Sequence, residues 1–313
     1  MNILFISLGC DKNLVDSEVM LGLLDSRGYQ IVDDETIADV IVVNTCCFIH
    51  DAKEESIQTI LEMAEYKKTG RLKALVVTGC LAQRYQQEII DEIPEVDAVL
   101  GTASYDKIAE AIDEALGGHS EMYLEDIDRL PQVSSKRLVT TGGHYAYLKI
   151  AEGCDKHCTY CIIPKVRGNF RSVPMEQLLK EAKELAEGGV KELILVAQET
   201  TVYGQDIYGE KSLHRLLREL CKIDGIQWIR LLYCYPEEID ANLIQVMKEE
   251  PKICHYLDLP IQHASDAILK KMGRRTSKAQ LVDTIRTLRE EIPDITLRTT
   301  LITGFPGETE EQH

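Results

Sequence analysis

The chain of 313 residues is longer than one hydrophobic core usually supports, so we expect two domains. Apolar residues make up 44% and charged residues 28%, the composition of an ordinary globular protein, and no run of about 18 apolar residues could span a membrane. The first residues, MNILFISLGCDK, lack the basic leader and cleavage site of a signal peptide. We therefore expect a cytoplasmic protein and exclude a membrane protein.

The net charge of −17 is unevenly distributed. Residues 1–130 carry 26 acidic and 10 basic side chains, a net charge of −16, whereas the other 183 residues have a net charge of −1. An acidic surface repels nucleic acid and favours a basic partner, so direct binding of nucleic acid is not expected. Selection for solubility alone is an equally good explanation of this charge.

Short apolar runs alternate with amphipathic stretches of helical period in the first third of the chain. The predicted strands span residues 2–9, 39–45, 73–79 and 97–101. The predicted helices span residues 16–27, 51–68, 82–93 and 105–116. This alternation indicates an α/β fold with a doubly wound parallel sheet, in which ligands bind beyond the carboxyl ends of the strands.

A cysteine directly follows each of the first three predicted strands: Cys10, Cys46 and Cys80. Neighbouring parallel strands lie about 5 Å apart, so the three thiols can converge on one point. Packing of small apolar side chains explains one such cysteine well but explains three in the same register poorly. The Cys47 side chain should point away from that of Cys46, so we expect only one of this pair to join the group.

Residues 117–143 are rich in glycine, serine and turn residues and predict a linker that contains an edge strand. We place the first domain at residues 1–130 and the linker at 131–143. Five further strand and helix units predict a partial βα barrel over residues 144–313, with its site at the carboxyl ends of the strands. These predicted strands span residues 144–150, 191–197, 227–233, 255–261 and 295–302. The chain ends where the next helix should begin, so we expect a barrel truncated before its last strand.

The loop after the first barrel strand reads EGCDKHCTYCIIPKVRG and places Cys154, Cys158 and Cys161 in a C-x3-C-x2-C array. A disulfide is disfavoured in a reducing compartment. Structural zinc requires four ligands, and His157 could be the fourth, but zinc sites usually use two separated pairs. Three thiolates in one tight loop instead suit a cubane iron-sulfur cluster that leaves one iron open.

This array after the first strand of a βα barrel resembles the radical S-adenosylmethionine enzymes, and Tyr160 occupies the aromatic position that their motif carries before the last cysteine. The resemblance implies a 4Fe-4S cluster at Cys154, Cys158 and Cys161. Its open iron would chelate S-adenosylmethionine, and one-electron reduction would yield a 5′-deoxyadenosyl radical.

Further motifs narrow the resemblance to the methylthiotransferases over essentially the whole chain. The motifs are SLGCDKNLVDSE, NTCCFI, TGCLAQRY and GCDKHCTYCIIPKVRG. In that family, cysteines at the positions of Cys10, Cys46 and Cys80 hold a second 4Fe-4S cluster, whose open iron carries the sulfur to be methylated and transferred. The family also has a C-terminal TRAM domain, which we expect these 313 residues not to include.

The segments LVAQETTVYG, RLLYCYP, YLDLPIQHASDAILKKMGRR and LRTTLITGFPGETEE are similar to the branch that methylthiolates the β-carbon of an aspartate in a small-subunit ribosomal protein. Asp11 departs from that branch, which often has proline or serine there. The resemblance implies a basic ribosomal protein substrate, a sulfur donor and a one-electron reductant such as flavodoxin or ferredoxin. The alternatives are a transfer-RNA methylthiotransferase and a non-enzymatic iron-sulfur or zinc scaffold.

The resemblance also implies contacts with S-adenosylmethionine from Tyr160 and from polar groups at the ends of barrel strands. Gln198 and Glu199 would bind the methionine amine, while Gln262 and Arg298 would bind the ribose or the carboxylate. His263 and the segment ITGFPGE, residues 302–308, are further candidates. For each residue taken singly, a structural hydrogen bond is as good an explanation.

Overall fold

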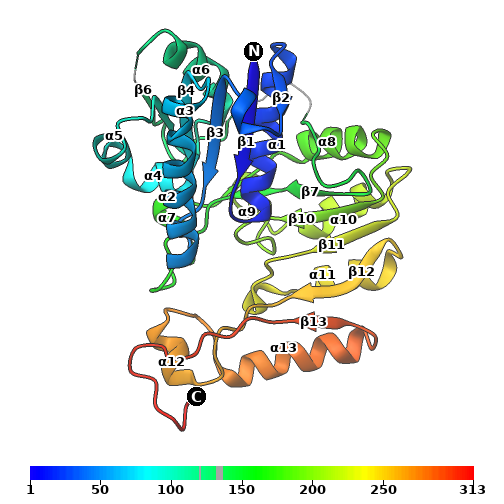
Figure 1. Ribbon diagram of the computed structural model, residues 1–313. Helices are drawn as coiled ribbons and strands as arrows, with labels where there is room; N and C mark the ends of the chain where they lie inside the picture. The colour runs from blue at the N-terminus through cyan, green and yellow to red at the C-terminus, as the bar shows by residue number, and fades with distance from the viewer. Residues whose placement is uncertain (120, 132–136) are drawn as a thin grey trace. The chain divides into compact units, whose positions relative to one another are not determined.

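The computed structural model describes residues 1–119, 121–131 and 137–313 (Figure 1). They form two compact units, of which the first comprises Met1–Thr140 with Ile162–Gly168 and the second comprises Thr141–Cys161 with Asn169–His313. The first unit therefore includes a short segment from within the region that we had assigned to the barrel, and it extends ten residues beyond the predicted boundary. Part of the predicted linker, residues 132–136, lies outside the described residues.

The first unit contains a six-stranded parallel sheet with the strand order β2-β1-β3-β4-β5-β6. Its strands are β1 (Asn2–Ser7), β2 (Gln30–Val32), β3 (Val40–Thr45), β4 (Ala74–Gly79), β5 (Ala98–Leu100) and β6 (Glu121–Tyr123). Short strands β2 and β6 form the two edges, and β6 is the edge strand expected within residues 117–143. The strands β1, β3 and β4, which precede the three cysteines, are neighbours at the centre.

Helices cover both faces of this sheet, as the doubly wound fold requires (Figure 1). They are α1 (Asp11–Ser26), α2 (His50–Ala64), α3 (Tyr66–Thr69), α4 (Cys80–Tyr85), α5 (Gln87–Glu92), α6 (Ile108–Leu116) and α7 (Ile163–Arg167), with 3₁₀ turns at Glu35–Ile37 and Tyr105–Lys107. The predicted helix at residues 82–93 is wrong as a single helix, because Gln86 adopts a φ of 45° between α4 and α5. Helix α1 begins five residues earlier than predicted.

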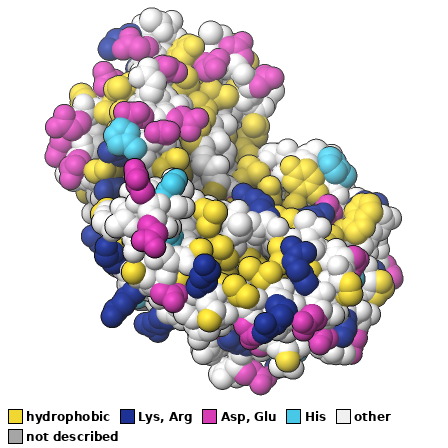
Figure 2. Space-filling model, turned by 90° about the horizontal axis from the view of Figure 1, so that it is seen from below, with side chains coloured by type: hydrophobic (Ala, Val, Ile, Leu, Met, Phe, Trp, Pro, Cys, Tyr) yellow, Lys and Arg dark blue, Asp and Glu magenta, His cyan; other side chains and the backbone are white. Residues whose placement is uncertain are grey.

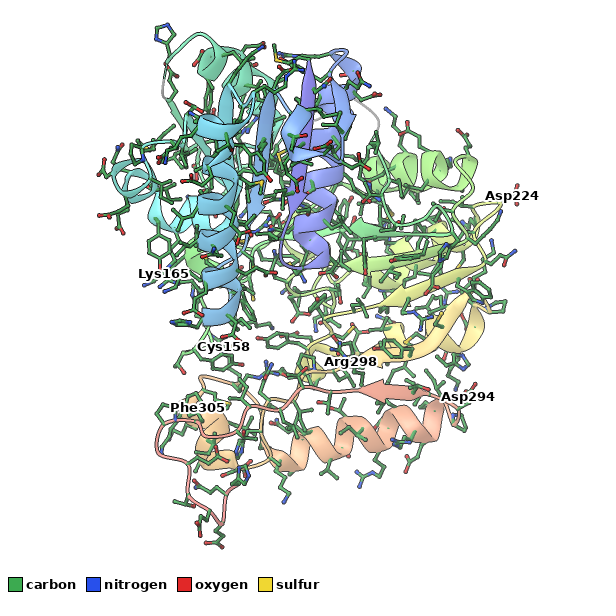
Figure 3. All side chains as sticks on the ribbon, in the orientation of Figure 1. Cys158, Lys165, Asp224, Asp294, Arg298 and Phe305 are labelled. Carbon is green, nitrogen blue, oxygen red and sulfur yellow. The ribbon has the colours of Figure 1, made fainter. Side chains whose placement is uncertain are left out.

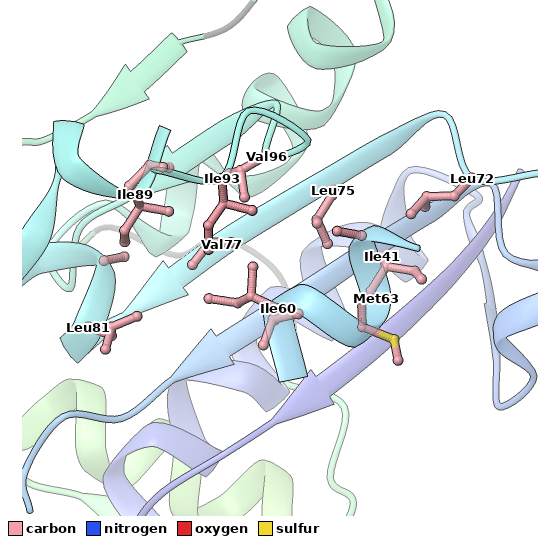
Figure 4. Packing of buried hydrophobic residues seen from close by; sticks show 14 of the residues in the cluster. Ile41, Ile60, Met63, Leu72, Leu75, Val77, Leu81, Ile89, Ile93 and Val96 are labelled. Atoms are coloured by element: carbon pink, nitrogen blue, oxygen red, sulfur yellow. The ribbon is translucent and has the colours of Figure 1, made fainter. Parts of the chain in front are cut away.

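Alternate residues of the central strands point to opposite faces and build two separate cores. Ile41, Leu75 and Val77 pack against α2 and α4 on one face, as Figure 4 shows for the residues around Ile60. Val40 and Val76 pack against α1 and α6 on the other face. Because both faces are buried, the strands are continuous apolar runs.

We expect Ile60→Ala to lower the free energy of unfolding of the first unit by about 2–5 kcal/mol, since Ile60 is fully buried and its removal leaves a cavity. Ile57→Ala is the matched control on the same helix, because Ile57 is 37% exposed. Denaturant titration followed by circular dichroism measures both. Equal losses for the two variants would contradict this assignment of the core.

The second unit contains a five-stranded parallel sheet with the strand order β13-β12-β11-β10-β7, which is the expected partial barrel of βα units (Figure 1). Its strands are β7 (Tyr145–Lys149), β10 (Glu192–Val196), β11 (Trp228–Leu231), β12 (Ile253–Asp258) and β13 (Thr296–Arg298). The antiparallel pair β8 (Ala151–Glu152) and β9 (Arg171–Ser172) frames the cysteine loop. All five predicted strands of this region are thus present in sequence order.

Amphipathic helices connect the strands of the second sheet. They are α8 (Met175–Glu187), α9 (Gln205–Tyr208), α10 (Leu213–Cys221), α11 (Ala241–Glu249), α12 (Asp266–Lys271) and α13 (Lys278–Glu291), with a 3₁₀ turn at Pro236–Glu238. Asp240 and Ser277 cap α11 and α13 by accepting hydrogen bonds from the backbone N–H groups of Leu243 and Gln280.

The face drawn in Figure 2 carries acidic and basic side chains with apolar ones between them. Among the described residues, no helix combines the length and the apolar character that crossing a bilayer requires.

Candidate functional site

The first cysteine trio lies at one edge of the first sheet, beyond the carboxyl ends of three neighbouring strands. Cys10 follows β1 and directly precedes α1, Cys46 follows β3, and Cys80 is the first residue of α4 after β4. Cys10 is exposed, Cys80 is half-buried and Cys46 is buried. This is the edge at which doubly wound sheets bind ligands.

Glycines before two of these cysteines allow the chain to turn tightly. Gly9 and Gly79 both have a φ of 92°, which other residues rarely adopt. A Cβ atom on Gly79 would lie 2.5 Å from the Thr45 carbonyl oxygen, and one on Gly9 would lie 2.8 Å from the Cβ of Cys46. The backbone segments that carry the three thiols can approach one another only because these positions lack side chains.

Buried polar side chains fix the same segments. The Asn13 amide Nδ2 donates to the carbonyl oxygens of Leu8 at 2.9 Å and Thr45 at 2.8 Å, so one side chain joins the segments of Cys10 and Cys46. The Ser56 hydroxyl accepts from the Cys46 N–H at 3.0 Å and also lies 2.9 Å from the Cys46 carbonyl oxygen. The Cys46 backbone is therefore held from both sides.

Burial and a neighbouring arginine change the pKa values of the thiols in this trio. Burial raises the pKa of Cys80 to about 12, and the Arg167 guanidinium opposes that shift. Burial also raises the pKa of Cys46. Cys47 is buried in the apolar cluster beneath α2 and α4, and its thiol donates to the Cys80 carbonyl oxygen at 3.2 Å.

The second cysteine trio lies in the loop after β7 and β8 of the second unit. Cys154 and Cys158 are buried and Cys161 is half-buried. Burial raises the pKa of Cys154 to about 12. Cys158 Sγ lies 3.1 Å from the Tyr235 hydroxyl, and Figure 3 labels Cys158.

Tyr235 is in turn fixed by a cation. The Arg274 guanidinium stacks on the Tyr235 ring at 4.1 Å from its centroid, and Arg274 also forms an ion pair with Glu237 at 3.3 Å. Arg274 Nε and Nη1 are buried without hydrogen-bond partners. A positive charge is thus buried behind the phenol that contacts Cys158.

If the second trio holds the cluster that the sequence resemblance implies, Tyr235→Phe should keep its iron content but lower both the reduction potential of that cluster and the rate of S-adenosylmethionine cleavage, the latter by about tenfold. The hydroxyl donor favours the more negative, reduced form, and the variant deletes it. Anaerobic potentiometry followed by electron paramagnetic resonance measures the potential. Tyr256→Phe on β12 is the matched control, and equal potentials in the two variants would refute this role.

The residues expected to bind the amine of S-adenosylmethionine lie after β10. Gln198 accepts from the Gly153 N–H at 2.9 Å and donates to Glu152 at 2.6 Å, so it braces the cysteine loop. Glu199 is fully buried, its Oε1 accepts from the Thr201 N–H at 2.9 Å, and its Oε2 has no hydrogen-bond partner. Burial raises the pKa of Glu199 to about 7, which a bound amine would reverse.

The other expected contacts differ in availability. Gln262 has a φ of 68°, and its buried Oε1 atom has no hydrogen-bond partner. Both features are typical of a residue in a ligand-binding site. Arg298, labelled in Figure 3, ends β13, has a side chain that is 59% exposed, and contacts Asp258 at 3.1 Å. His263 is instead engaged on both nitrogens, by the Ser265 N–H and by Glu308. Tyr160 packs edge-on against Phe305 of the ITGFPGE segment.

The spacing of the thiols favours clusters over zinc. Among the described residues, the only three metal-ligating side chains whose ligand atoms all lie within 4.8 Å of one another are His50, Asp51 and Glu54, which are exposed. A zinc ion about 2.3 Å from each sulfur requires thiolates about 4 Å apart, and neither cysteine trio reaches this spacing. A cubane places each thiolate on a different iron and so accepts wider spacing.

Sequence reasoning missed Arg167 and Tyr235, which contact Cys80 and Cys158, and Arg274, which stacks on the Tyr235 ring. Arg167 lies in the quoted IPKVRG stretch, and Tyr235 lies in the loop after β11, directly before the 3₁₀ turn Pro236–Glu238. The position of Tyr235 at the carboxyl end of a barrel strand was the available signal. Cys221 and Cys234 pack in the core.

Two family models match the chain. Residues 2–101 match a family described as uncharacterized protein family UPF0004, and residues 148–313 match the radical SAM superfamily. The parallel sheets, the C-x3-C-x2-C loop and the second match together define a radical S-adenosylmethionine protein.

Sequence identity to known proteins assigns the chain to one family within this class. The chain is 71% identical over its full length to the ribosomal protein uS12 methylthiotransferase RimO of Lachnoclostridium phytofermentans, and it covers 71% of that relative. It is 55% identical to the RimO proteins of Clostridioides difficile and Geobacter sulfurreducens, with 97% and 98% of this chain and 69% of each relative covered. The chain belongs to the RimO methylthiotransferase family.

Solved structures share the fold at low sequence identity. The radical S-adenosylmethionine methyltransferase TsrM from Kitasatospora setae is 15% identical, with a TM-score of 0.69 over 99% of this chain and 69% of that chain. The cobalamin-dependent S-adenosylmethionine radical enzyme OxsB is 12% identical, with a TM-score of 0.65 over 96% of this chain and 49% of that chain. Both support the fold and nothing beyond it.

Proposed function

We propose that this protein methylthiolates the β-carbon of an aspartate in the small-subunit ribosomal protein uS12. The observation that carries the proposal is the presence of two cysteine trios, each beyond the carboxyl ends of a parallel sheet, in a chain that is 71% identical to a uS12 methylthiotransferase. The enzyme is a radical S-adenosylmethionine methylthiotransferase that uses two 4Fe-4S clusters and S-adenosylmethionine.

We assign one cluster to each trio. Cys154, Cys158 and Cys161 bind the radical cluster within the barrel domain, residues 144–313. Cys10, Cys46 and Cys80 bind the auxiliary cluster within the first domain, residues 1–130. When bound, the radical cluster would supply the electron that cleaves S-adenosylmethionine, and the auxiliary cluster would hold the sulfur that is transferred.

The protein's own residues bind and orient the reactants. Glu199 Oε2 has no hydrogen-bond partner, which supports binding of the amino group of S-adenosylmethionine. Gln262 Oε1 also has no partner, which supports a hydrogen bond with the ribose of S-adenosylmethionine. Arg298 can pair with a carboxylate because its side chain is largely exposed. Gln198 joins this site to the cysteine loop through the Gly153 N–H. These contacts align the cofactor before reaction.

A protein substrate fits the charge of this chain better than transfer RNA does. Residues 1–130 have a net charge of −16, which attracts a basic ribosomal protein and repels a polyanion. The alternative, a transfer-RNA methylthiotransferase, requires a basic surface, and the charge distribution gives no support to one.

The reaction also requires partners. We propose a small one-electron donor such as flavodoxin or ferredoxin and a separate sulfur donor. We place the protein in the cytoplasm, because ten cysteines without a disulfide suit a reducing compartment.

The test is anaerobic incubation of the reconstituted protein with S-adenosylmethionine, sulfide, a reductant and uS12, followed by mass spectrometry. We expect uS12 to gain one methylthio group on an aspartate. Transfer RNA added in the same reaction is the competing substrate, and modification of RNA but not of uS12 would overturn the proposal.

A further inference from the structure

Helix α7 packs in the first unit although it follows the second cysteine array in sequence. Val166 is 2% exposed within the apolar cluster that also contains Leu81 of α4. The Thr102 hydroxyl donates to the Val166 carbonyl oxygen at 2.7 Å. These contacts place the next residue, Arg167, beside Cys80.

All three nitrogens of the Arg167 guanidinium are engaged within this unit. Nε donates to Cys80 Sγ at 3.3 Å and Nη1 donates to the Asp16 carboxylate at 2.7 Å. Nη2 donates to the Asn13 Oδ1 atom. The side chains of Arg167 and Asp16 are only 3% and 5% exposed.

Asn13 extends this network to the other two cysteines. Its Oδ1 accepts from Arg167, while its Nδ2 donates to the carbonyl oxygens of Leu8 and Thr45, which lie two residues and one residue before Cys10 and Cys46. A single guanidinium therefore touches one ligand sulfur directly and the segments of the other two through one amide.

The energetic balance indicates that this arrangement serves more than packing. A buried ion pair such as Arg167–Asp16 is usually no more stabilising than well-packed apolar residues of similar volume. A hydrogen bond from a guanidinium to a neutral thiol is weak, whereas one to a metal-bound thiolate is charge-assisted. The contact gains most of its strength when Cys80 is a thiolate ligand.

We propose that Arg167 is a positioning residue for the auxiliary cluster: it donates its Nε–H to the Cys80 thiolate and favours the reduced, more negative form of that cluster. This inference rests on the proposed function, which assigns the auxiliary cluster to Cys10, Cys46 and Cys80. It deepens that function by making a residue from α7 part of the first site.

The experiment compares Arg167→Gln, Arg167→Lys and Lys165→Gln in the full chain. Lys165→Gln is the matched control, because it removes one positive charge from the same helix at an exposed position, labelled in Figure 3. Alanine at Cys154, Cys158 and Cys161 in a parallel set isolates the auxiliary cluster for potentiometry followed by electron paramagnetic resonance. Methylthiolation of uS12 and formation of 5′-deoxyadenosine are measured with the second trio intact.

We expect Arg167→Gln to lower the potential of the auxiliary cluster and to reduce methylthiolation by about tenfold or more, with unchanged formation of 5′-deoxyadenosine. Arg167→Lys keeps the positive charge but lacks the planar guanidinium with its several N–H donors, so its cluster potential and methylthiolation rate should be intermediate. Lys165→Gln should match the parent. The proposal would also be supported if Arg167→Gln lost the iron of the auxiliary cluster but kept the iron of the second trio, and if Arg167→Lys kept part of the auxiliary iron.

The proposal would be overturned if the Arg167 variants that retain the auxiliary cluster had the same reduction potential as the parent. A lower melting temperature before reconstitution, together with that unchanged potential, would identify a purely structural arginine. Failure of the cluster assignment gives a different result, since the parent with alanine at the second trio would then bind no iron-sulfur cluster. Failure of the uS12 assignment would change only the methylthiolation assay and would leave the measured potentials unaffected.

Discussion

Cys158→Ala should abolish both 5′-deoxyadenosine formation and methylthiolation of uS12. Cys158 is one of three thiols in the barrel loop, is 7% exposed, and contacts Tyr235, so no neighbouring thiol can replace it without moving the loop. We expect the iron content to fall by about half, because only the auxiliary cluster would remain. Iron analysis and chromatography of the reaction products measure both effects.

Cys234→Ala is the matched control for this variant. Cys234 is also a buried cysteine of the second unit, but its thiol lies 3.4 Å from the Thr200 hydroxyl and contacts no cysteine of the array. It should retain the full iron content. Wild-type production of 5′-deoxyadenosine by Cys158→Ala would contradict the assignment of the radical cluster.

Cys10→Ala should separate the two activities. The first trio is proposed to carry the sulfur and the second to cleave S-adenosylmethionine, so the variant should lose methylthiolation and still form 5′-deoxyadenosine. Cys10 is exposed at the start of α1, which makes a folding defect in the variant small. Both products are quantified in the same anaerobic reaction.

Cys47→Ala is the control for the first trio, because Cys47 lies beside Cys46 yet packs into the apolar cluster. We expect it to retain methylthiolation. Loss of 5′-deoxyadenosine formation as well as methylthiolation in Cys10→Ala would show that this division of labour is wrong.

Several features of the site could be predicted from sequence because they follow from periodicity. The apolar runs located the strands, and the cysteines after β1, β3 and β4 therefore had to share one edge of a parallel sheet. The same reasoning placed Cys154 at the carboxyl end of the first barrel strand. These are local patterns whose geometric consequence is fixed by the fold.

Other features depend on contacts between distant residues. Arg167 and Asp16 are 151 positions apart, and no periodicity in the IPKVRG stretch indicates that its helix packs in the first unit. The early start of α1 was missed because Lys12 and Asn13 are polar, yet both are buried there, Lys12 paired with Asp11 and Asn13 bonded to backbone carbonyls. The break at Gln86 requires a positive φ that sequence does not signal for glutamine.

Asp11 illustrates a departure from the family pattern with a local explanation. It is the first residue of α1, where a negative charge is favourable, and it forms an ion pair with Lys12 at 2.9 Å. The departure leaves the positions of the cysteines unchanged.

The central claim is that both cysteine trios hold a 4Fe-4S cluster, and the iron and acid-labile sulfide content after anaerobic reconstitution tests it most directly. We predict about eight iron and eight sulfide per chain, falling to about four of each when either trio is replaced by alanine. Zinc without sulfide, or an iron content that does not respond to replacement of Cys10, Cys46 and Cys80, would contradict the claim.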